Sequence, residues 1–292
     1  MKLKKLLATG LAAIMVMGLV GCSSSSKSSS ASASSAASSS TEKVDKLEKV
    51  KKAGVLRMGT SADYAPYEFH TVIDGKDTIV GFDTTIVEEV AKDMGVKVEY
   101  TDMDFDGLLG ALNADKVDVV LACMTPDETR KKSVDFSELY YEDSNVCIVR
   151  KGDEDIVKSA DDLKDLKVGV QSGTTQAGYV TEDLGITEAK QLKRVPDLML
   201  ELQNKNIDVI VTGRNVAQIN IGQYDGLVIG NTEVGQEVAE TSAVAVKKAD
   251  DKVDNTAFIE SINKTIKRLQ DEGKIDEYMQ DALKLADKQE EE

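Results

Sequence analysis

Apolar positions follow two alternating periods along the chain. Residues 55–59 and 96–100 show the every-second-position spacing of half-buried strands, and residues 117–121 form a short apolar run. Between these runs, residues 83–94 and 105–114 have helical spacing, and the apolar stripe of the first consists of Ile86, Val87, Val90, Ala91 and Met94. Strands that alternate with helices predict a parallel sheet with helices on its faces.

The same order of elements recurs in the second half of the chain. Strands are predicted at residues 167–170, 207–211 and 243–246, and helices at 174–183, 196–204, 255–269 and 275–285. The helix–strand segment 112–121 also resembles segment 202–211. This pattern predicts two similar α/β lobes, with a chance similarity of two helix–strand units as the alternative.

The beginning of the chain has a different character. Three lysines precede an apolar run that ends just before Cys22, and residues 23–40 are almost entirely serine and alanine. Small residues before a cysteine at the end of a short apolar run are typical of a lipoprotein signal. We expect a signal peptide at residues 1–21, lipidation of Cys22 and a Ser/Ala-rich tether at residues 22–44; a plain membrane anchor with an incidental cysteine is the alternative.

Composition narrows the functional classes. The formal net charge of −16 argues against a nucleic-acid partner and against tight contact with anionic lipid. His70 is the single histidine and lies in a segment that we predict to be a loop, so neither a histidine-based nucleophile system nor a zinc site is expected. Cys123 and Cys147 are expected to be free thiols, with a bridge between them as the alternative. We predict no metal, no cofactor and no catalytic residue.

Five segments carry a resemblance to a known family. They read GTSADYAPYEF (59–69), VGFD (80–83), DGLLGAL (106–112), MTPDETRKKSVDFS (124–137) and VGVQSGTT (168–175). In this order and spacing they resemble the bacterial solute-binding proteins of family 3, the receptors of polar-amino-acid importers of the ABC type. The resemblance spans residues 54–285.

The resemblance implies a two-lobed periplasmic-binding-protein fold of type II, in which each lobe is a mixed, mostly parallel sheet flanked by helices. Lobe 1 would comprise residues 45–144 plus 244–292, and lobe 2 residues 145–243. Two hinge crossovers would lie near 144–146 and 242–244, and a ligand would bind in the cleft. The chain would then be a non-enzymatic lipoprotein on the outer face of the cell membrane that delivers an amino acid to an ABC permease.

Arg130 falls at the position where the family binds the ligand's α-carboxylate. A planar guanidinium holds both carboxylate oxygens at once, which suits this role. Thr125 lies five residues earlier, where the family places a ligand contact. The order Thr125-Pro126-Asp127-Glu128 is also a capping box with proline at the first helical position, so a helix is predicted to start here and Thr125 is interpreted as a cap, a ligand contact or both.

The resemblance places other ligand contacts on both lobes. Tyr64 and Phe105 match the aromatic walls of the family's pocket, with core packing as the alternative. Ala122 and Cys123 match a strand end that offers backbone groups and small side chains, and Cys123 either narrows the pocket or simply packs.

On lobe 2, Gly173 and Thr174 would offer backbone N–H and hydroxyl donors at a helix start, unless they form an ordinary turn. Gln171 precedes them in the same motif and is predicted to join the site.

Two residues depart from the family pattern. Ser61 stands where receptors for basic amino acids often carry an aspartate, so a neutral or polar ligand is expected. Gly213 stands where the family places the aspartate that pairs with the α-ammonium. We expect substitutes such as the Thr125 hydroxyl, backbone carbonyls or a carboxylate from residues 237–240, or else a ligand without a free α-ammonium. Under the first alternative, Gly213→Asp is predicted to preserve or tighten binding.

Other functions are weighed beside this one. The chain could be a receptor for a carboxylate or a peptide-like ligand without a free α-ammonium, or a ligand-sensing subunit that acts through a membrane partner. An enzyme of the dehydratase kind on the same fold would need a positioned acid or base in the cleft.

Overall fold

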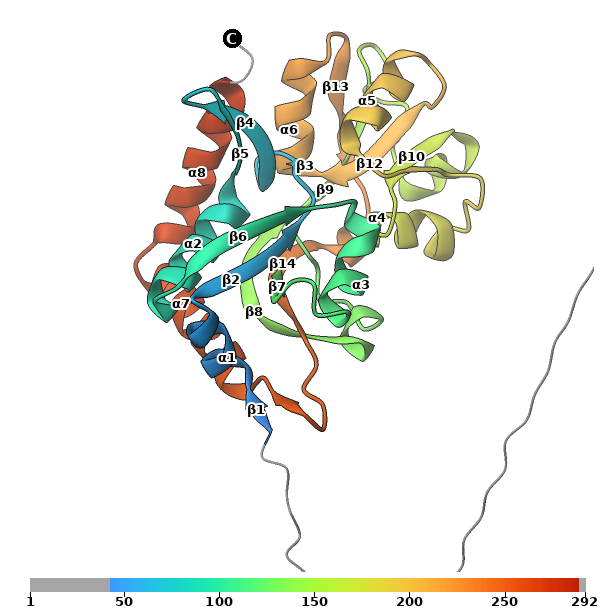
Figure 1. The fold of residues 1–292 in the computed structure, drawn as a ribbon. Coiled ribbons are helices and arrows are strands. Elements are labelled where there is room, and N and C mark those ends of the chain that lie inside the picture. Colours follow the sequence, from blue (N-terminus) through green and yellow to red (C-terminus); the bar gives the residue numbers. More distant parts are fainter. Residues whose placement is uncertain (1–42, 289–292) are drawn as a thin grey trace, which may run out of the picture. The chain divides into compact units, whose positions relative to one another are not determined.

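The computed structural model describes residues 43–288, and Figure 1 shows their ribbon. The predicted signal peptide, Cys22 and nearly all of the predicted tether lie outside the described residues. Within residues 43–288, no helix has the length and apolar character needed to cross a membrane.

The first lobe is built on a five-stranded mixed sheet. Its strands, in spatial order, are β6 (Lys97–Asp102), β2 (Val55–Thr60), β7 (Val119–Val120), β14 (Glu240–Lys247) and β8 (Val134–Asp143). Strand β2 pairs in parallel with both neighbours, whereas β14 is antiparallel to β7 and β8. Successive residues of the buried run point to opposite faces, so Val119 and Leu121 join one apolar cluster while Val120 and Ala122 join another. Helices are therefore needed on both faces.

The helices that cover the sheet of lobe 1 lie close to the residue ranges predicted from the spacing of apolar positions. On one face, α2 (Phe82–Met94) and α7 (Thr256–Asp271) pack together, and α3 (Leu108–Asn113) packs on β2, β7 and β14. Lobe 1 also contains α1 (Lys46–Ala53), α8 (Lys274–Asp287), the pair β1 (Val44–Asp45) with β15 (Val253–Asp254), and a small sheet of β3 (Asp63–Tyr64), β4 (Glu68–Ile73) and β5 (Lys76–Val80).

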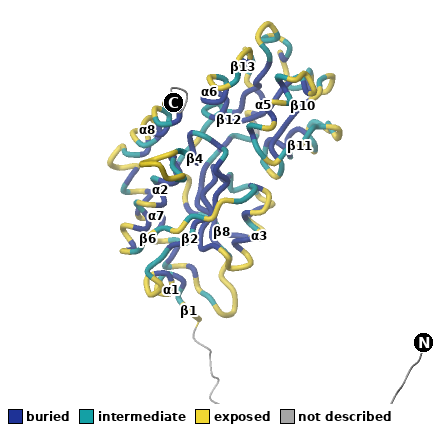
Figure 2. The backbone as a smooth tube through the Cα atoms, turned by 45° about the horizontal axis from the view of Figure 1, so that its top comes forward, coloured by how far each residue is buried: buried dark blue, intermediate teal, exposed yellow. Residues whose placement is uncertain are grey.

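The second lobe has its own five-stranded sheet. Its order is β11 (Lys190–Leu192), β10 (Val168–Gln171), β12 (Val209–Gly213), β9 (Asn145–Arg150) and β13 (Leu227–Glu233). Strand β10 is parallel to β11 and β12, and β9 runs antiparallel to β12 and β13. The helices are α4 (Thr175–Gly178), α5 (Val195–Gln203) and α6 (Arg214–Gln223). Figure 2 shows the central strands of both sheets, β2, β7 and β14 in lobe 1 and β10, β12 and β9 in lobe 2, as mostly buried and the β4–β5 turn as exposed.

The chain passes between the sheets twice. Strand β8 leads through Ser144 into β9, and the return runs from β13 through a short helix, Gln236–Val238, into β14. Glu240, the first residue of β14, already pairs with Asp143 of β8. One apolar cluster includes residues of both lobes, among them Tyr64 and Val195, so the lobes are in direct contact.

Two local predictions were wrong, and a third was right in its bounds but not in its helix type. No α-helix begins at Thr125: residues 124–127 are irregular, and only a 3-10 turn forms at Arg130–Lys132. Asp127, two residues later, takes the capping position, because its Oδ1 accepts the N–H groups of Thr129 and Arg130, and only the short turn follows. His70 lies in strand β4 rather than a loop. The helix predicted over 174–183 is present, with α4 followed directly by a π-helical turn at Tyr179–Asp183.

Candidate functional site

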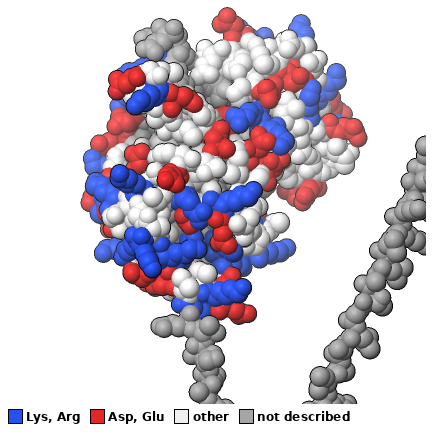
Figure 3. Space-filling view, viewed as in Figure 1, with Lys and Arg blue, Asp and Glu red and all other residues white. Residues whose placement is uncertain are grey.

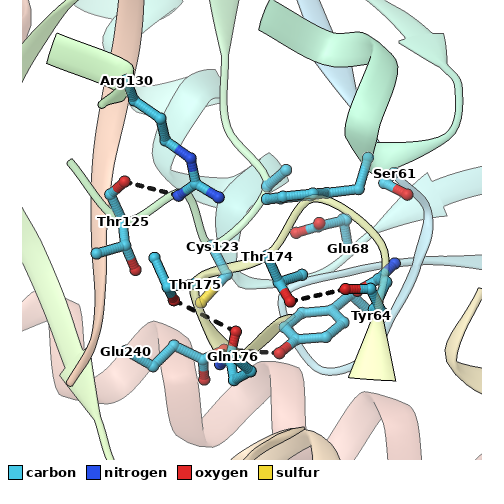
Figure 4. A pocket seen from close by; sticks show the side chains of 13 residues that line it. Ser61, Tyr64, Glu68, Cys123, Thr125, Arg130, Thr174, Thr175, Gln176 and Glu240 are labelled. Atoms are coloured by element: carbon cyan, nitrogen blue, oxygen red, sulfur yellow. Dashed lines mark hydrogen bonds between the residues drawn. The ribbon is translucent and has the colours of Figure 1, made fainter. Parts of the chain in front are cut away.

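A small pocket lies between the two lobes. Its wall consists of Ser61, Tyr64, Glu68, Phe105, Ala122, Cys123, Thr125, Arg130, Gln171, Thr174, Thr175, Gln176 and Glu240. Figure 4 shows these side chains converging from elements far apart in sequence. The structure thus brings together all the predicted site residues except Gly173 and Gly213, which lie next to the wall. Their contacts with a ligand stay predictions.

Arg130 provides the positive charge of the pocket. The side chain is nearly buried; Nη1 donates to the carbonyl of Thr125 at 2.7 Å and Nη2 donates to the carbonyl of Gly173, on the other lobe, at 2.8 Å. The guanidinium lies 5.4 Å from the centroid of the Phe105 ring. Asp127 is 3.3 Å from Nε, but the other partners are neutral carbonyls. A buried cation with so little compensation favours an anionic ligand group.

The backbone just after β7, at Cys123, has an uncommon conformation. Cys123 has φ 46°, in the left-handed region, and its N–H donates to Asp83 Oδ2 at 2.8 Å. The hydroxyl of Tyr140 donates to the other oxygen of Asp83 at 2.8 Å. Burial raises the pKa of Asp83 to about 7 and raises the pKa of the Cys123 thiol well above its usual range. Asp83 therefore orients the backbone that carries Ala122 and Cys123. Cys123 and Cys147 are free thiols, as predicted.

Glu68 is a pocket residue that the sequence analysis missed. Its carboxyl group is fully buried, and neither oxygen accepts a hydrogen bond from an N–H or O–H group. Burial first, and then the neighbouring Asp83, raise the pKa of Glu68 well above its usual range. A protonated Glu68 can donate to Asp83, which relieves the repulsion between the two acids. The sequence feature that could have indicated Glu68 is its place in segment 59–69, between two aromatic residues that the structure shows to be buried.

The polar and aromatic residues of lobe 1 close one side of the pocket. The Tyr64 hydroxyl donates to Glu240 Oε1 at 2.6 Å, and Ser61 Oγ donates to Asp63 Oδ1 at 2.9 Å. The Thr125 hydroxyl is not a helix cap, because its oxygen accepts the N–H of Thr241 at 3.2 Å.

The start of α4 forms the opposite wall. Thr174 caps this helix: its hydroxyl donates to the Gln171 carbonyl and its oxygen accepts the N–H of Ala177. Gln171 Nε2 donates to the carbonyl of Lys193 at 3.0 Å. Gln176, which the sequence analysis missed together with Thr175, donates from Nε2 to Glu240 Oε1 at 3.0 Å. Continuing the motif 168–175 by one residue would have included it.

Glu240 occupies the place that an aspartate at position 213 would fill. The side chain is buried, and a Cβ added to Gly213 would fall far inside the contact distance of its Oε2 atom. Burial raises the pKa of Glu240 to about 8, although the hydrogen bonds from Tyr64 and Gln176 act in the opposite direction. Oε2 has no hydrogen-bond donor. The carboxylate predicted from residues 237–240 is thus present. A side chain at position 213 would require the Glu240 carboxylate to move, and the effect of Gly213→Asp on binding stays a prediction.

The pocket therefore has the charge pattern of a binding site for a zwitterion. Arg130 offers donors to an anion, and Glu240 keeps an acceptor oxygen for a cation. Among residues 43–288 there is no cluster of histidine, cysteine and acidic side chains suited to a metal ion.

Comparisons with known proteins agree with this geometry. Residues 56–284 match the family described as bacterial extracellular solute-binding proteins, family 3. The chain is 36% identical over 234 residues to the arginine-binding extracellular protein ArtP of Bacillus subtilis (76% of this chain, 83% of the relative). It is 28% identical over 222 residues to the L-cystine-binding protein TcyJ of Escherichia coli (76% and 80%).

A solved structure shares the fold. It is an amino acid ABC transporter substrate-binding protein from Streptococcus pneumoniae bound to L-arginine, with a TM-score of 0.76, 30% identity and coverage of 82% of this chain and 98% of that one. The predicted type II fold is confirmed by this likeness. The match to the family covers well over half of the chain. The chain therefore belongs to the bacterial extracellular solute-binding proteins of family 3.

Proposed function

We propose that this chain is the receptor of an ABC importer that holds a free amino acid between its lobes and delivers it to the permease. The observation that carries the proposal is the placement of Arg130 and Glu240 in the wall of one buried pocket. The α-carboxylate would bind the guanidinium in a bidentate manner, and the α-ammonium would bind the free Oε2 of Glu240. Several convergent polar groups in a small pocket are typical of specific small-molecule sites.

The side chain of the ligand is a separate question. We expected a neutral or polar amino acid because Ser61 is not an aspartate, and the comparisons do not support that expectation, because one relative is named for arginine and another for cystine. Glu68 also adds a buried carboxyl group to the wall. Basic amino acids and cystine therefore belong in any search for the ligand.

The alternatives rest on fewer observations. A ligand without an α-ammonium would leave Glu240 Oε2 buried and unpaired, which is unfavourable. A sensing role would use the same pocket and act through another protein. A dehydratase-like activity has a weaker basis, because the family is one of binding proteins.

Anchoring completes the proposal. We propose that residues 1–21 are removed as a signal peptide, that Cys22 is lipidated, and that the Ser/Ala-rich tether lets the receptor reach its permease from the outer face of the membrane.

A thermal-shift screen tests the proposed function. A ligand that binds only the folded state raises the melting temperature by mass action. The wild-type protein and Arg130→Ala would be screened against the twenty amino acids, L-cystine, dipeptides, α-keto acids and small dicarboxylates. We expect at least one amino acid to stabilise the wild type but not the variant. Stabilisation by carboxylates alone would contradict the amino-acid assignment.

A further inference from the structure

At the N-terminus of helix α5 in lobe 2, no side chain of the N-cap residue accepts a hydrogen bond from the first backbone N–H groups. Its first residue is Val195, proline follows at the second position, and the preceding Arg194 gives no side-chain cap. The acceptor comes from lobe 1: Oδ2 of Asp63 accepts the N–H of Val195 at 3.1 Å. Asp63 belongs to β3, which packs beside α5. A carboxylate at a helix N-terminus satisfies an orphan N–H group and interacts favourably with the helix dipole.

Asp63 is held in place from the pocket side. Ser61, a residue of the pocket wall, donates from Oγ to Oδ1 of Asp63 at 2.9 Å. One oxygen of the Asp63 carboxylate therefore contacts the pocket wall, and the other contacts the other lobe. Burial raises the pKa of Asp63, while the bonds from Ser61 and Val195 and the charge of Arg194 act against that rise.

The partner segment on lobe 2 is also tied to the pocket wall. Gln171 lines the pocket and donates to the carbonyl of Lys193, two residues before α5 starts. Around the cap, Lys193 Nζ lies 2.5 Å from Asp104 and the Arg194 guanidinium lies 3.6 Å from Asp102. Figure 3 shows basic and acidic side chains meeting where the lobes adjoin. These pairs are partly exposed, so solvent and salt weaken them.

We infer that Asp63 is a positioning residue for ligand capture, because it caps α5 across the cleft only when the lobes are closed. Opening the cleft would separate β3 from α5 and leave the Val195 N–H without its acceptor, and Arg194 has no side-chain oxygen that could replace it. Ser61 and Gln171 each touch the pocket on one side and the cap on the other, so a ligand that orders these two side chains also orders the cap. The inference rests on the proposed function only in so far as a ligand drives closure.

Amide hydrogen exchange measured by NMR tests the inference directly. The protected fraction of the Val195 amide reports how much of the population has the cap formed. We would compare the wild type with Asp63→Ala, Asp63→Asn and Lys193→Ala, each without ligand and with an equimolar mixture of the twenty L-amino acids and L-cystine. Asparagine is as good an N-cap as aspartate, whereas alanine is not. Lys193→Ala is the matched control, because it removes an exposed rim pair and leaves the cap.

The expected result is specific. With the mixture present, the Val195 amide of Asp63→Ala should exchange about 2- to 30-fold faster than that of the wild type, the range that corresponds to loss of an N-cap. In Asp63→Asn and Lys193→Ala the rate should stay within about twofold. Addition of the mixture should slow exchange of the Val195 amide in the wild type more than in Asp63→Ala. Equal rates for the wild type and Asp63→Ala, measured when the mixture protects the amides of residues 174–177, would overturn the inference.

Failure of the proposed function would look different. If the mixture leaves the amides of residues 174–177 in the pocket wall unchanged, no amino acid binds, and the ligand-free comparison of Asp63→Ala with the wild type alone decides whether the cap exists. If those amides become protected but Asp63→Asn loses the cap as fully as Asp63→Ala does, the carboxylate charge rather than the capping oxygen is responsible, and the capping mechanism is wrong.

Discussion

Glu240→Gln is the change that most directly tests how the ligand's ammonium group is held. Glutamine keeps the size of the side chain and an oxygen that accepts the hydrogen bond from Tyr64, but it removes the negative charge. If Glu240 faces the ammonium, the variant should bind the amino acid more weakly while its fold and its empty pocket stay intact. Glu128→Gln is a matched control, since Glu128 pairs with Lys131 at the surface outside the pocket.

The size of the loss follows from two opposing quantities. Opposite unit charges about 4 Å apart attract by about 4 kcal/mol at the effective dielectric constant of protein sites. Burial raises the pKa of Glu240 to about 8, so ionising it at pH 7 costs about 1.4 kcal/mol. The difference of about 2.6 kcal/mol corresponds to roughly 70-fold in affinity, within the range measured when one partner of a buried charge pair is removed.

Isothermal titration at pH 7, with the amino acid found by the screen and its α-keto acid, separates the outcomes. The keto acid should bind the wild type at least tenfold more weakly than the amino acid, about 1.4 kcal/mol, and should not weaken further in Glu240→Gln. Gly213→Asp should bind poorly, because its side chain meets the Glu240 carboxylate. In the Glu240→Ala background, the same substitution should recover part of the affinity. The reasoning is refuted if Glu240→Gln binds the amino acid within about threefold of the wild type.

Four further results are expected. Arg130→Ala should lose about thirty- to several-thousand-fold in affinity by calorimetry while keeping its circular dichroism spectrum, since it removes one partner of a buried charge pair; unchanged affinity would remove Arg130 from the site. Ammonium binding favours the ionised Glu240, so affinity should rise with pH up to about 8, by at most tenfold per pH unit, with proton release in calorimetry, and a flat profile would argue against this pairing. Lys46 and Arg57 hold the pKa of buried Asp118 at about 2, which adds on the order of 2 kcal/mol of stability that is present above about pH 4 and is lost as pH falls through 2; Asp118→Asn should lower the free energy of unfolding at pH 7 by a similar amount in urea titrations and remove this acid dependence. Cys22→Ala should release the protein from membranes in fractionation without changing ligand affinity, and retention would indicate an uncleaved anchor.

The elements with strong periodicity could be predicted closely from the sequence. The helix predicted at 83–94 is α2 (Phe82–Met94), because its apolar stripe is long and glycine follows it in the left-handed conformation. The segment after Thr125 was predicted wrongly because one pattern fits two structures. A threonine followed three residues later by glutamate favours a capped helix, but the capping side chain observed is that of Asp127, which accepts the N–H groups of Thr129 and Arg130.

Some site residues could be predicted from short local segments, whereas others depend on how distant strands pair. Arg130, Tyr64 and Phe105 stand within local segments, so their positions could be compared with a family pattern one segment at a time. Glu240 is different. Its proximity to Gly213 depends on the pairing of β12 with β9 and of β14 with β8, a relation between strands that no short segment contains. From the sequence alone, the carboxylate could therefore be limited to residues 237–240 but not assigned to one of them.

The neighbourhood of Gly213 shows why the missing aspartate is a rearrangement of the pocket rather than a loss. At Gly213 the absence of a side chain leaves the space that the Glu240 carboxylate fills. A glutamate that approaches from β14 instead of β12 comes from the strand that links the two lobes, where it also accepts the Tyr64 hydroxyl of lobe 1 and the Gln176 amide of lobe 2. The two bonds can exist at the same time only when the lobes are together. The acid that we propose for the ligand's ammonium is thus also a residue through which the two lobes contact each other, so ligand charge and cleft closure act on the same side chain.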